Sequence, residues 1–342
     1  MLAIFGLLGV FVAGVAADGL LSLRATPDDV PDDDPEPKDE DTVEHGDLLV
    51  DAPEPRAGTP YDTDEDSPTS DDLPDPQDAP VLLEGGSGDD LLNGGEAADD
   101  ISGGAGNDQI AAKDGDDSLD AGAGDDAVWA GAGDDDVAGG AGSDTLHGQD
   151  GDDLVTGDFG DDSLYGHAGD DTLSGGAGAD ALLGGAGDDQ LDGGADADWL
   201  AGGDGSDALV GGAGSDVLDG NGGDDRLDGT GDGGVTDYLN GGSGDDMLAL
   251  GAGDHATGGT GADTFSLQDW LGQGTVATIA DYDFTQDQIV VVYDASTHPD
   301  PQLSLATEAD TDDVTILLDG APVAVVTGGS SVFLSDIRLS AA

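Results

Sequence analysis

Apolar residues recur at every ninth position between Gly85 and Ser266, each two positions after an aspartate. The unit reads glycine, glycine, any residue, glycine, any residue, aspartate, any residue, apolar, any residue, and about twenty copies follow one another in phase. The glycines suit a tight turn because they adopt left-handed backbone conformations easily, and the last three positions suit a short strand whose centre faces inward. Two units then make one coil, and stacked coils bury each other's apolar residues. We predict an all-β fold, a parallel β-roll solenoid.

Aspartate occupies the sixth position of the unit almost throughout. These candidate metal ligands are Asp90, Asp99, Asp108, Asp117, Asp126, Asp135, Asp144, Asp153, Asp162, Asp171, Asp180, Asp189, Asp198, Asp207, Asp216, Asp225, Asp237, Asp246 and Asp263. Nineteen of twenty units keep both the aspartate and the apolar residue, and the exception has His255 and Thr257 in those places. A disordered glycine- and aspartate-rich stretch is the alternative, but disorder does not require an apolar residue held in phase.

The charge of the chain indicates its partner. Six Lys and Arg residues stand against 78 Asp and Glu, for a formal net charge of -72. Nucleic-acid binding is excluded because it needs basic side chains to neutralise phosphates. Carboxylates are hard oxygen ligands that favour calcium over magnesium. Cysteine is absent and the five histidines are scattered, so we expect no zinc, haem, iron–sulfur or disulfide chemistry.

The same aspartates set a physical problem for the fold. Each coil has only two apolar residues to bury, and stacking brings like-charged carboxylates of successive coils close together. A divalent cation between neighbouring turns would convert that repulsion into attraction, with glycine carbonyls completing its oxygen shell. We therefore expect calcium binding and folding to be one event.

These units resemble the GGxGxDxUx nonapeptides of repeats-in-toxin (RTX) proteins, the calcium-binding β-roll modules of hemolysin-type toxins and serralysin-type proteases exported by Gram-negative bacteria. The resemblance covers about half of the chain. It implies that the sixth-position aspartates, together with carbonyls such as those of Gly86, Gly88, Gly104 and Gly106, ligate several calcium ions between turns two units apart.

Some units depart from the pattern. Lys113 replaces a turn glycine, and we expect its ammonium group to weaken calcium binding nearby. Ala97 and Asp196 replace the fourth-position glycine. The unit 229–240 carries three extra residues, which we interpret as an enlarged turn that keeps the phase. The eight-residue stretch 250–257 breaks the rhythm, and we expect a local defect in metal occupancy there.

The fifth-position aspartates have two interpretations, and the aromatic and histidine residues of the repeats are given no role in binding. Direct ligation and solvated surface charge are equally good explanations for the fifth-position aspartates Asp89, Asp116, Asp125, Asp134, Asp152 and Asp161. Trp129, Trp199 and Tyr165 are interpreted as surface packing, and His147 and His167 as exposed residues without a role.

Composition divides the chain into four parts. Residues 1–24 are an apolar segment, interpreted first as a secretory signal and second as a membrane anchor, the only membrane contact expected. Residues 25–84 are acidic and proline-rich, and we expect a disordered arm. Residues 85–266 form the calcium-binding roll. Residues 267–342 form a small β-rich cap, because solenoid ends need covering.

In the cap, alternating β-branched residues predict strands over 275–279, 288–293, 314–318, 322–326 and 332–337. The stretch 278–294 resembles the segment that follows the last repeat in exported RTX proteins, which implies a type I secretion signal at the C-terminus and the type I secretion apparatus as a partner. Type I substrates usually lack a cleaved leader, so the apolar N-terminus supports a different export route, and both routes stay as alternatives.

An enzyme is the main rival to a calcium-binding protein. The sequence has no HExxH zinc motif, no GxSxG nucleophile elbow and no cysteine nucleophile. We therefore expect no catalytic activity and place the chain outside the cell or on the surface of a Gram-negative bacterium. The alternatives are an adhesin, a surface-layer or biofilm-matrix rod, and an RTX-family hydrolase whose catalytic site has no recognisable motif.

Overall fold

Most nine-residue units form a strand of six residues, longer than the three that the pattern predicts. In β3 (Asp100–Ala105) and β8 (Thr145–Asp150), the strand runs from the seventh position of one unit to the third position of the next. Buried and accessible residues alternate along it, so that the apolar eighth position and the first position of the next unit both face inward. The two leading glycines therefore belong to the strand, and the turn is confined to positions four to six.

The computed structural model describes residues 79–231, 233–268, 275–307, 311–329 and 332–342. The predicted signal or anchor, and the predicted arm up to residue 78, lie outside the described residues. The first strand begins at Leu82, so the solenoid starts within the last residues assigned to the arm. In the part of the chain that is described, no helix is long and apolar enough to cross a membrane.

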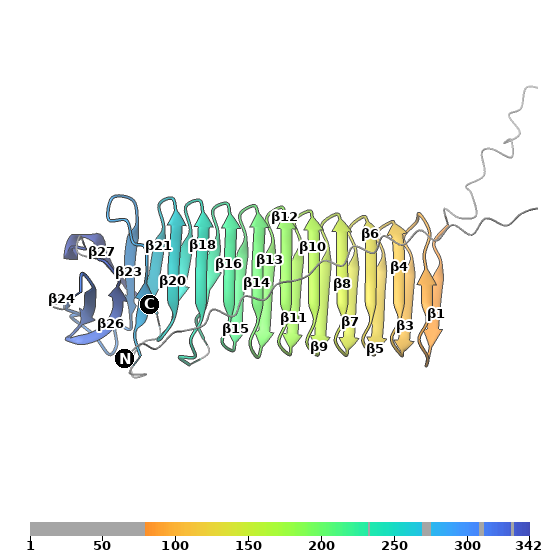
Figure 1. The fold of residues 1–342 in the computed structure, drawn as a ribbon, viewed down its shortest axis with the longest axis horizontal. Helices are drawn as coiled ribbons and strands as arrows, with labels where there is room; N and C mark the ends of the chain where they lie inside the picture. Colours follow the sequence, from red (N-terminus) through yellow and green to blue (C-terminus); the bar gives the residue numbers. More distant parts are fainter. Residues whose placement is uncertain (1–78, 232, 269–274, 308–310, 330–331) are drawn as a thin grey trace, which may run out of the picture. The chain divides into compact units, whose positions relative to one another are not determined.

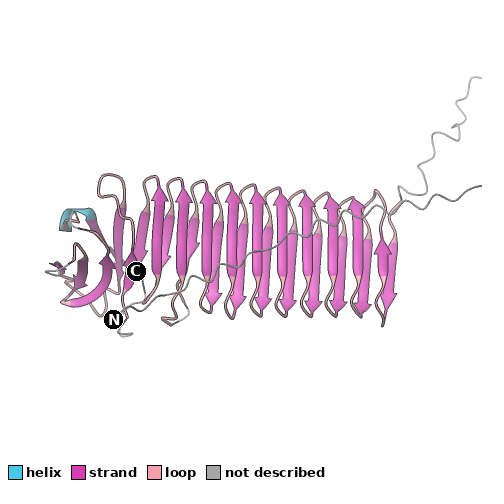
Figure 2. Ribbon diagram, viewed as in Figure 1, coloured by secondary structure: helices cyan, strands magenta, loops and turns pink. Residues whose placement is uncertain are grey.

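The strands form two sheets that run side by side along the solenoid, with a single helical turn near the C-terminus of the described chain (Figures 1 and 2). The first sheet contains, in spatial order, β1 (Leu82–Gly86), β3 (Asp100–Ala105), β5 (Ser118–Ala123), β7 (Asp136–Ala141), β9 (Leu154–Phe159), β11 (Thr172–Ala177), β13 (Gln190–Ala195), β15 (Ala208–Ala213), β17 (Arg226–Asp228), β19 (Met247–Leu250), β21 (Thr264–Leu267), β23 (Gln288–Tyr293) and β27 (Ile337–Ala341).

The second sheet contains β2 (Leu91–Asn93), β4 (Gln109–Asp114), β6 (Ala127–Ala132), β8 (Thr145–Asp150), β10 (Ser163–Ala168), β12 (Ala181–Ala186), β14 (Trp199–Asp204), β16 (Val217–Gly222), β18 (Tyr238–Ser243), β20 (His255–Thr260), β22 (Ala277–Ile279), β26 (Ala321–Val326), β25 (Val314–Leu318) and β24 (Leu303–Thr307). From β1 to β23, consecutive strands in the sequence thus alternate between the sheets, as one coil of a parallel solenoid requires.

Within the repeats, neighbouring strands of each sheet are parallel and most pair residues 18 apart, as Leu146 and Leu164 do. The enlarged turn raises this spacing to 21, and Leu218 still pairs with Leu239. The following short unit lowers the spacing to 17, and Leu239 pairs with Ala256. Both irregularities are therefore absorbed in turns, and the inward-facing column continues without interruption.

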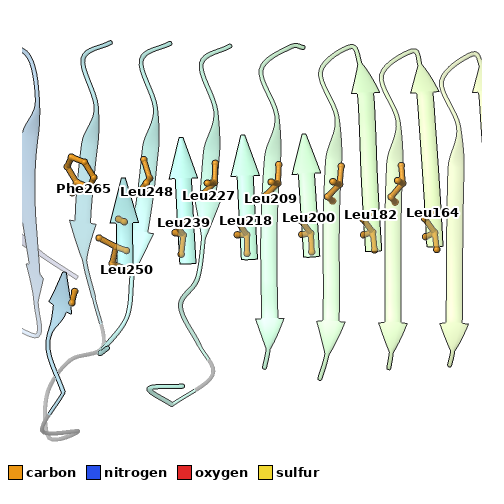
Figure 3. Close-up of a cluster of buried hydrophobic side chains, with 14 of the residues drawn as sticks. Leu164, Leu182, Leu200, Leu209, Leu218, Leu227, Leu239, Leu248, Leu250 and Phe265 are labelled. Carbon is orange, nitrogen blue, oxygen red and sulfur yellow. The ribbon is translucent and has the colours of Figure 1, made fainter. Parts of the chain in front are cut away.

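The core is a double column of apolar side chains between the two sheets. Leu164, Leu182, Leu200, Leu218 and Leu239 come from the second sheet, and side chains of the first sheet face them (Figure 3). These leucines are almost completely buried. Since each strand contributes one large side chain, the core is only one layer thick along its whole length.

The C-terminal segment continues both sheets rather than closing the roll as a separate layer. β22 and β26 extend the second sheet in parallel, and β23 and β27 extend the first. β24, β25 and β26 form an antiparallel meander, of which the sequence analysis missed β24. The strand predicted over 332–337 is wrong, because a helical turn (Leu334–Asp336) occupies its centre and β27 begins only at Ile337.

Candidate metal sites along two aspartate columns

The sixth-position aspartates form two continuous hydrogen-bonded columns, one at the start of each sheet's strands. In each column, the Oδ1 atom of an aspartate accepts the backbone N–H of the corresponding aspartate one coil earlier; Asp162 Oδ1, for example, lies 2.8 Å from the nitrogen of Asp144. The first column contains Asp90, Asp108, Asp126, Asp144, Asp162, Asp180, Asp198, Asp216, Asp237 and Asp254. The second contains Asp99, Asp117, Asp135, Asp153, Asp171, Asp189, Asp207, Asp225, Asp246 and Asp263.

Every predicted ligand is buried except Asp90, which is half-buried at the open end of its column. The second carboxylate oxygen, Oδ2, has no hydrogen-bond donor in most of them, namely Asp108, Asp117, Asp126, Asp135, Asp144, Asp153, Asp162, Asp171, Asp180, Asp189, Asp198, Asp207, Asp225 and Asp246. A buried carboxylate oxygen without a donor is costly and calls for a partner such as a cation.

The first-position glycine leaves room for this oxygen. A methyl group on Gly148 would collide with Oδ2 of Asp153, and one on Gly166 with Oδ2 of Asp171. Glycine at this inward-facing position therefore serves the aspartate of its own unit, whereas the second- and fourth-position glycines serve the backbone, as Gly104 and Gly106 do with φ values of 100° and 121°.

Burial raises the pKa of many of the column aspartates. Desolvation, reinforced by neighbouring carboxylates, raises the pKa of Asp153, Asp189 and Asp198 to about 7. The same causes raise the pKa to about 6 for Asp135, Asp144, Asp162, Asp225 and Asp246. The backbone N–H donated to Oδ1 opposes the shift without cancelling it. Near neutral pH, ionised carboxylates in these columns are thus held in an unfavourable environment that a bound cation would relieve.

Carbonyl oxygens of the turn glycines face the next coil. A methyl group on Gly104 would collide with the carbonyl oxygen of Gly86, and one on Gly106 with the carbonyl group of Gly88. These are the carbonyls that the family resemblance implies as ligands. Among the described residues, no three His, Asp or Glu side chains gather at one point. A metal ion in a column would therefore use backbone carbonyls as well as carboxylates, which is the oxygen donor set that calcium prefers.

The short unit corrects one prediction. Counting in nines placed His255 and Thr257 at the aspartate and apolar positions, but His255 pairs with Tyr238 and Ala256 with Leu239. Asp254 therefore holds the sixth position, where it is fully buried and its Oδ1 accepts the N–H of Asp237. The missing residue comes from the turn, and the hydrogen-bonded column continues through the short unit.

The second column also extends past the last repeat. Asp287 Oδ1 lies 3.1 Å from the backbone nitrogen of Asp263, and its Oδ2 accepts the N–H of Asp283 at 2.7 Å. The sequence contained a signal for this, because Asp287 stands two residues before the buried Ile289, the same spacing as in the repeats. The unit lacks the glycines, which is why the pattern did not reveal it.

The fifth-position aspartates have a different position and direction. Asp89, Asp116, Asp125, Asp134, Asp152 and Asp161 are exposed, and each accepts the backbone N–H of the residue 18 positions later. They therefore link turns on the outside of the roll, and this role is satisfied without a metal.

Lys113 lies in β4, at the second position of its unit, which the sequence analysis had assigned to the turn. It adopts a φ of 95°, and its Nζ atom donates a hydrogen bond to the carbonyl oxygen of Gly94. The ammonium group thus hydrogen-bonds to a turn carbonyl oxygen of the kind that would ligate a metal ion.

The model of the RTX calcium-binding nonapeptide repeat (4 copies) matches residues 82–110, 112–146, 147–182, 165–200, 174–209, 201–235 and 236–254, about half of the chain. The chain belongs to this family. Its nonapeptide repeats bind calcium, and the number of repeats means several ions. None of the curated proteins compared with the chain matches it.

Among solved structures, the chain is similar to the AlgE6R3 subunit of the Azotobacter vinelandii mannuronan C5-epimerase. The two are 22% identical over 44% of this chain and 78% of that one, with a TM-score of 0.17. The family assignment depends on the repeat match and not on this likeness.

Proposed function

We propose that this chain is an exported calcium-binding protein whose roll folds when it binds Ca²⁺ outside the cell. The observation that supports this best is the pair of buried aspartate columns, in which carboxylate oxygens without donors repeat coil after coil. The ions would be held by the sixth-position aspartates, including Asp254, together with turn carbonyls such as those of Gly86 and Gly88. Calcium supplies the positive charge that these oxygens need in order to be buried while ionised.

Folding and binding are coupled because the donor set exists only when coils stack. Each column takes one carboxylate from each coil, and the carbonyls of one turn face the next coil. The unfolded chain therefore offers no preformed site. A ligand that binds only the folded state stabilises it by mass action. The single-layer core buries little apolar surface to oppose the repulsion between stacked carboxylates. The bound ions would therefore contribute most of the free energy that favours the folded state.

Export gives this coupling a direction. In calcium-poor cytosol the acidic chain would stay unfolded and could pass through the channel of a type I secretion apparatus. Outside, calcium in the range that extracellular modules typically bind, about 0.1–1 mM, would fold it. Folding on the far side would prevent return. The role proposed here is ion binding coupled to folding and requires no catalytic residue.

The test of coupling is far-UV circular dichroism of the purified chain during a calcium titration. After removal of metal on a chelating resin, we expect the chain to lack β structure at pH 7.5 and to gain it cooperatively as CaCl₂ is added. MgCl₂ at the same concentrations is the control, and we expect it to be much less effective because Mg²⁺ keeps its waters and demands octahedral geometry. A roll that keeps its β signal after exhaustive chelation would contradict the proposal.

The test of export is fractionation of the producing bacterium. We expect the chain in the culture medium if it is released, or in the membrane fraction if residues 1–24 are retained. Recovery in the cytosol alone would exclude both versions of the proposal.

A further inference from the structure

Two histidines that lie far apart in the sequence meet on the outer face of the second sheet. His147 is in β8 and His167 in the neighbouring strand β10, which pairs with β8 at a spacing of 18 residues (Figure 1). The Nδ1 atom of His147 lies 3.0 Å from the Nε2 atom of His167. The sequence analysis treated both as exposed residues without a role, because their spacing of 20 becomes a contact only through the pitch of the coil.

Aromatic rings hold His147 in place. Trp129 from β6 and Tyr165 from β10 stack on it, with ring centroids 5.8 and 4.6 Å away and interplanar angles of 6° and 13°. Tyr165 also stacks on His167, at 6.0 Å. Stacking of this kind restricts the imidazole orientations before any ligand arrives, which lowers the ordering cost of binding.

His167 stands at a position where its own backbone is strained. It has a φ of 84° at the second position of its unit, where the neighbouring strand β12 has Gly185 and the other neighbour, β8, has Gln149 at a φ of 91°. A side chain at positive φ costs on the order of 1 kcal/mol relative to glycine. Lys113, Gln149, Asp158 and Asn221 have a positive φ at the same position of their units, and His167 differs from them in that its ring meets the ring of a second histidine.

We propose that His147 and His167 form a binding site for a borderline divalent transition metal such as Zn²⁺, separate from the calcium sites. Two nitrogens bound at about 2.0–2.1 Å to one ion in neighbouring coordination positions lie roughly 2.9–3.4 Å apart. The observed separation of 3.0 Å falls in this range. Imidazole nitrogens select zinc, copper and nickel, whereas calcium takes oxygen ligands. Water would fill the remaining positions.

The electrostatic surroundings agree with this site. Burial, and then the neighbouring His167, lowers the pKa of His147, so its ring is the neutral form that binds metals at neutral pH. The chain's net charge of -72 raises the local concentration of cations.

The test is zinc binding to the folded chain, measured by isothermal titration with ZnCl₂ in the presence of saturating calcium, which occupies the carboxylate sites. The variants are His167→Gly, which restores the residue of the next strand, and His147→Asn, which places there the amide that Asn240 has at the equivalent position. His298→Asn is the control, because His298 lies in the C-terminal segment and pairs with Asp319. We expect the wild type and the control to bind one zinc ion more than either pair variant, or to bind it at least about tenfold more tightly.

Circular dichroism of each variant shows whether it is folded before zinc is added. A second measurement needs no variant. In the wild type, zinc should shift the imidazole ¹⁵N resonances of His147 and His167 and leave those of His298 unchanged. If zinc leaves the first two unchanged, or if folded pair variants bind zinc as the wild type does, the two rings form only a hydrogen-bonded pair and the proposal is wrong.

Discussion

At the scale of single residues, the sixth-position aspartate has two tasks that no other side chain combines. Its Oδ1 reaches back to a backbone N–H in the previous coil, and its Oδ2 lies buried beside the first-position glycine of its own unit. Asparagine would keep the first contact but remove the charge that attracts a cation. Calcium dependence should therefore be sensitive to a substitution that barely changes shape.

Asp162→Asn tests this point, with Asp161→Asn as the matched control one position away. The pKa of Asp162 is raised to about 6 by burial, whereas Asp161 is exposed. We expect Asp162→Asn to raise the calcium concentration needed for half-folding by roughly three- to tenfold, because one carboxylate ligand is lost. The calcium titration followed by circular dichroism measures it. Equal effects of the two substitutions would mean that only net charge matters.

Lys113→Gly should strengthen calcium binding. The substitution removes an ammonium group from the carbonyl of Gly94 and relieves a non-glycine residue at a φ of 95°, a strain of about 1 kcal/mol. We expect folding at a lower calcium concentration and a higher ion count by equilibrium dialysis. Arg226→Ser is the control. It removes the same charge from β17, where Arg226 forms an ion pair with Asp228. If both variants behave alike, long-range charge explains the result and the local contact does not.

At the scale of elements, the linear pattern predicted the number and direction of the repeats because turn glycine, aspartate and apolar residue all recur at one period. The prediction went wrong where hydrogen bonding between coils decides the outcome. Asp254 takes its place because the backbone of Asp237 fixes its register, and counting along the chain cannot show this. The extra length of each strand has the same origin, since inter-coil pairing extends through the leading glycines.

The C-terminal segment shows the limit of pattern reading. β23 and β25 were predicted with the bounds that they have, because their burial alternates. β24 was missed, and none of its residues is buried. Asp287 was missed as a column member because its turn has no glycine signature, although its spacing to Ile289 follows the rule.

Removing residues 231–233 tests the idea that turns absorb irregularity. A side chain on Gly231 or Gly233 would meet no other atom within 4 Å, so this loop projects away from the roll. The deletion restores the 18-residue spacing, and we expect an unchanged calcium midpoint and thermal unfolding temperature. Deleting Asp192 from β13 is the contrast: it shifts the following residues of the strand to the opposite faces, which should abolish cooperative folding. Loss of folding in the first deletion would show that the enlarged turn is itself structural.

At the scale of the whole molecule, the described roll combines two columns of carboxylates with a thin double column of apolar side chains. Each ion that binds would relieve repulsion for the coils on both sides, so occupancy and folding should spread along the solenoid as a nearest-neighbour process. The sequence could predict the charge and the columns' members other than Asp254 and Asp287. It could not predict that the carboxylates are buried with one oxygen paired and one not, because that depends on the packing of the first-position glycine.

The burial of these carboxylates makes stability depend on pH in an unusual direction. Asp153, Asp189 and Asp198 have a pKa raised to about 7, against a usual value of 3.8. A raised pKa means that the folded state binds protons more tightly than the unfolded state, so protonation favours folding. This contribution is complete below about pH 4 and is lost as the pH rises through 7. Protons and calcium therefore compete for the same oxygens while each favours the same fold.

We accordingly expect the calcium-free chain to gain β structure as the pH falls from 8 to about 5, and the folded chain to need more calcium for half-saturation of its sites over the same interval. Circular dichroism of the resin-treated chain measures the first effect, and calcium titrations at each pH measure the second. The triple variant with asparagine at positions 153, 189 and 198 is the control, because it removes the three highest of these pKa values and should flatten both dependences. A calcium-free chain that shows no gain of β structure on acidification would mean that the repulsion between carboxylates is not what keeps it unfolded.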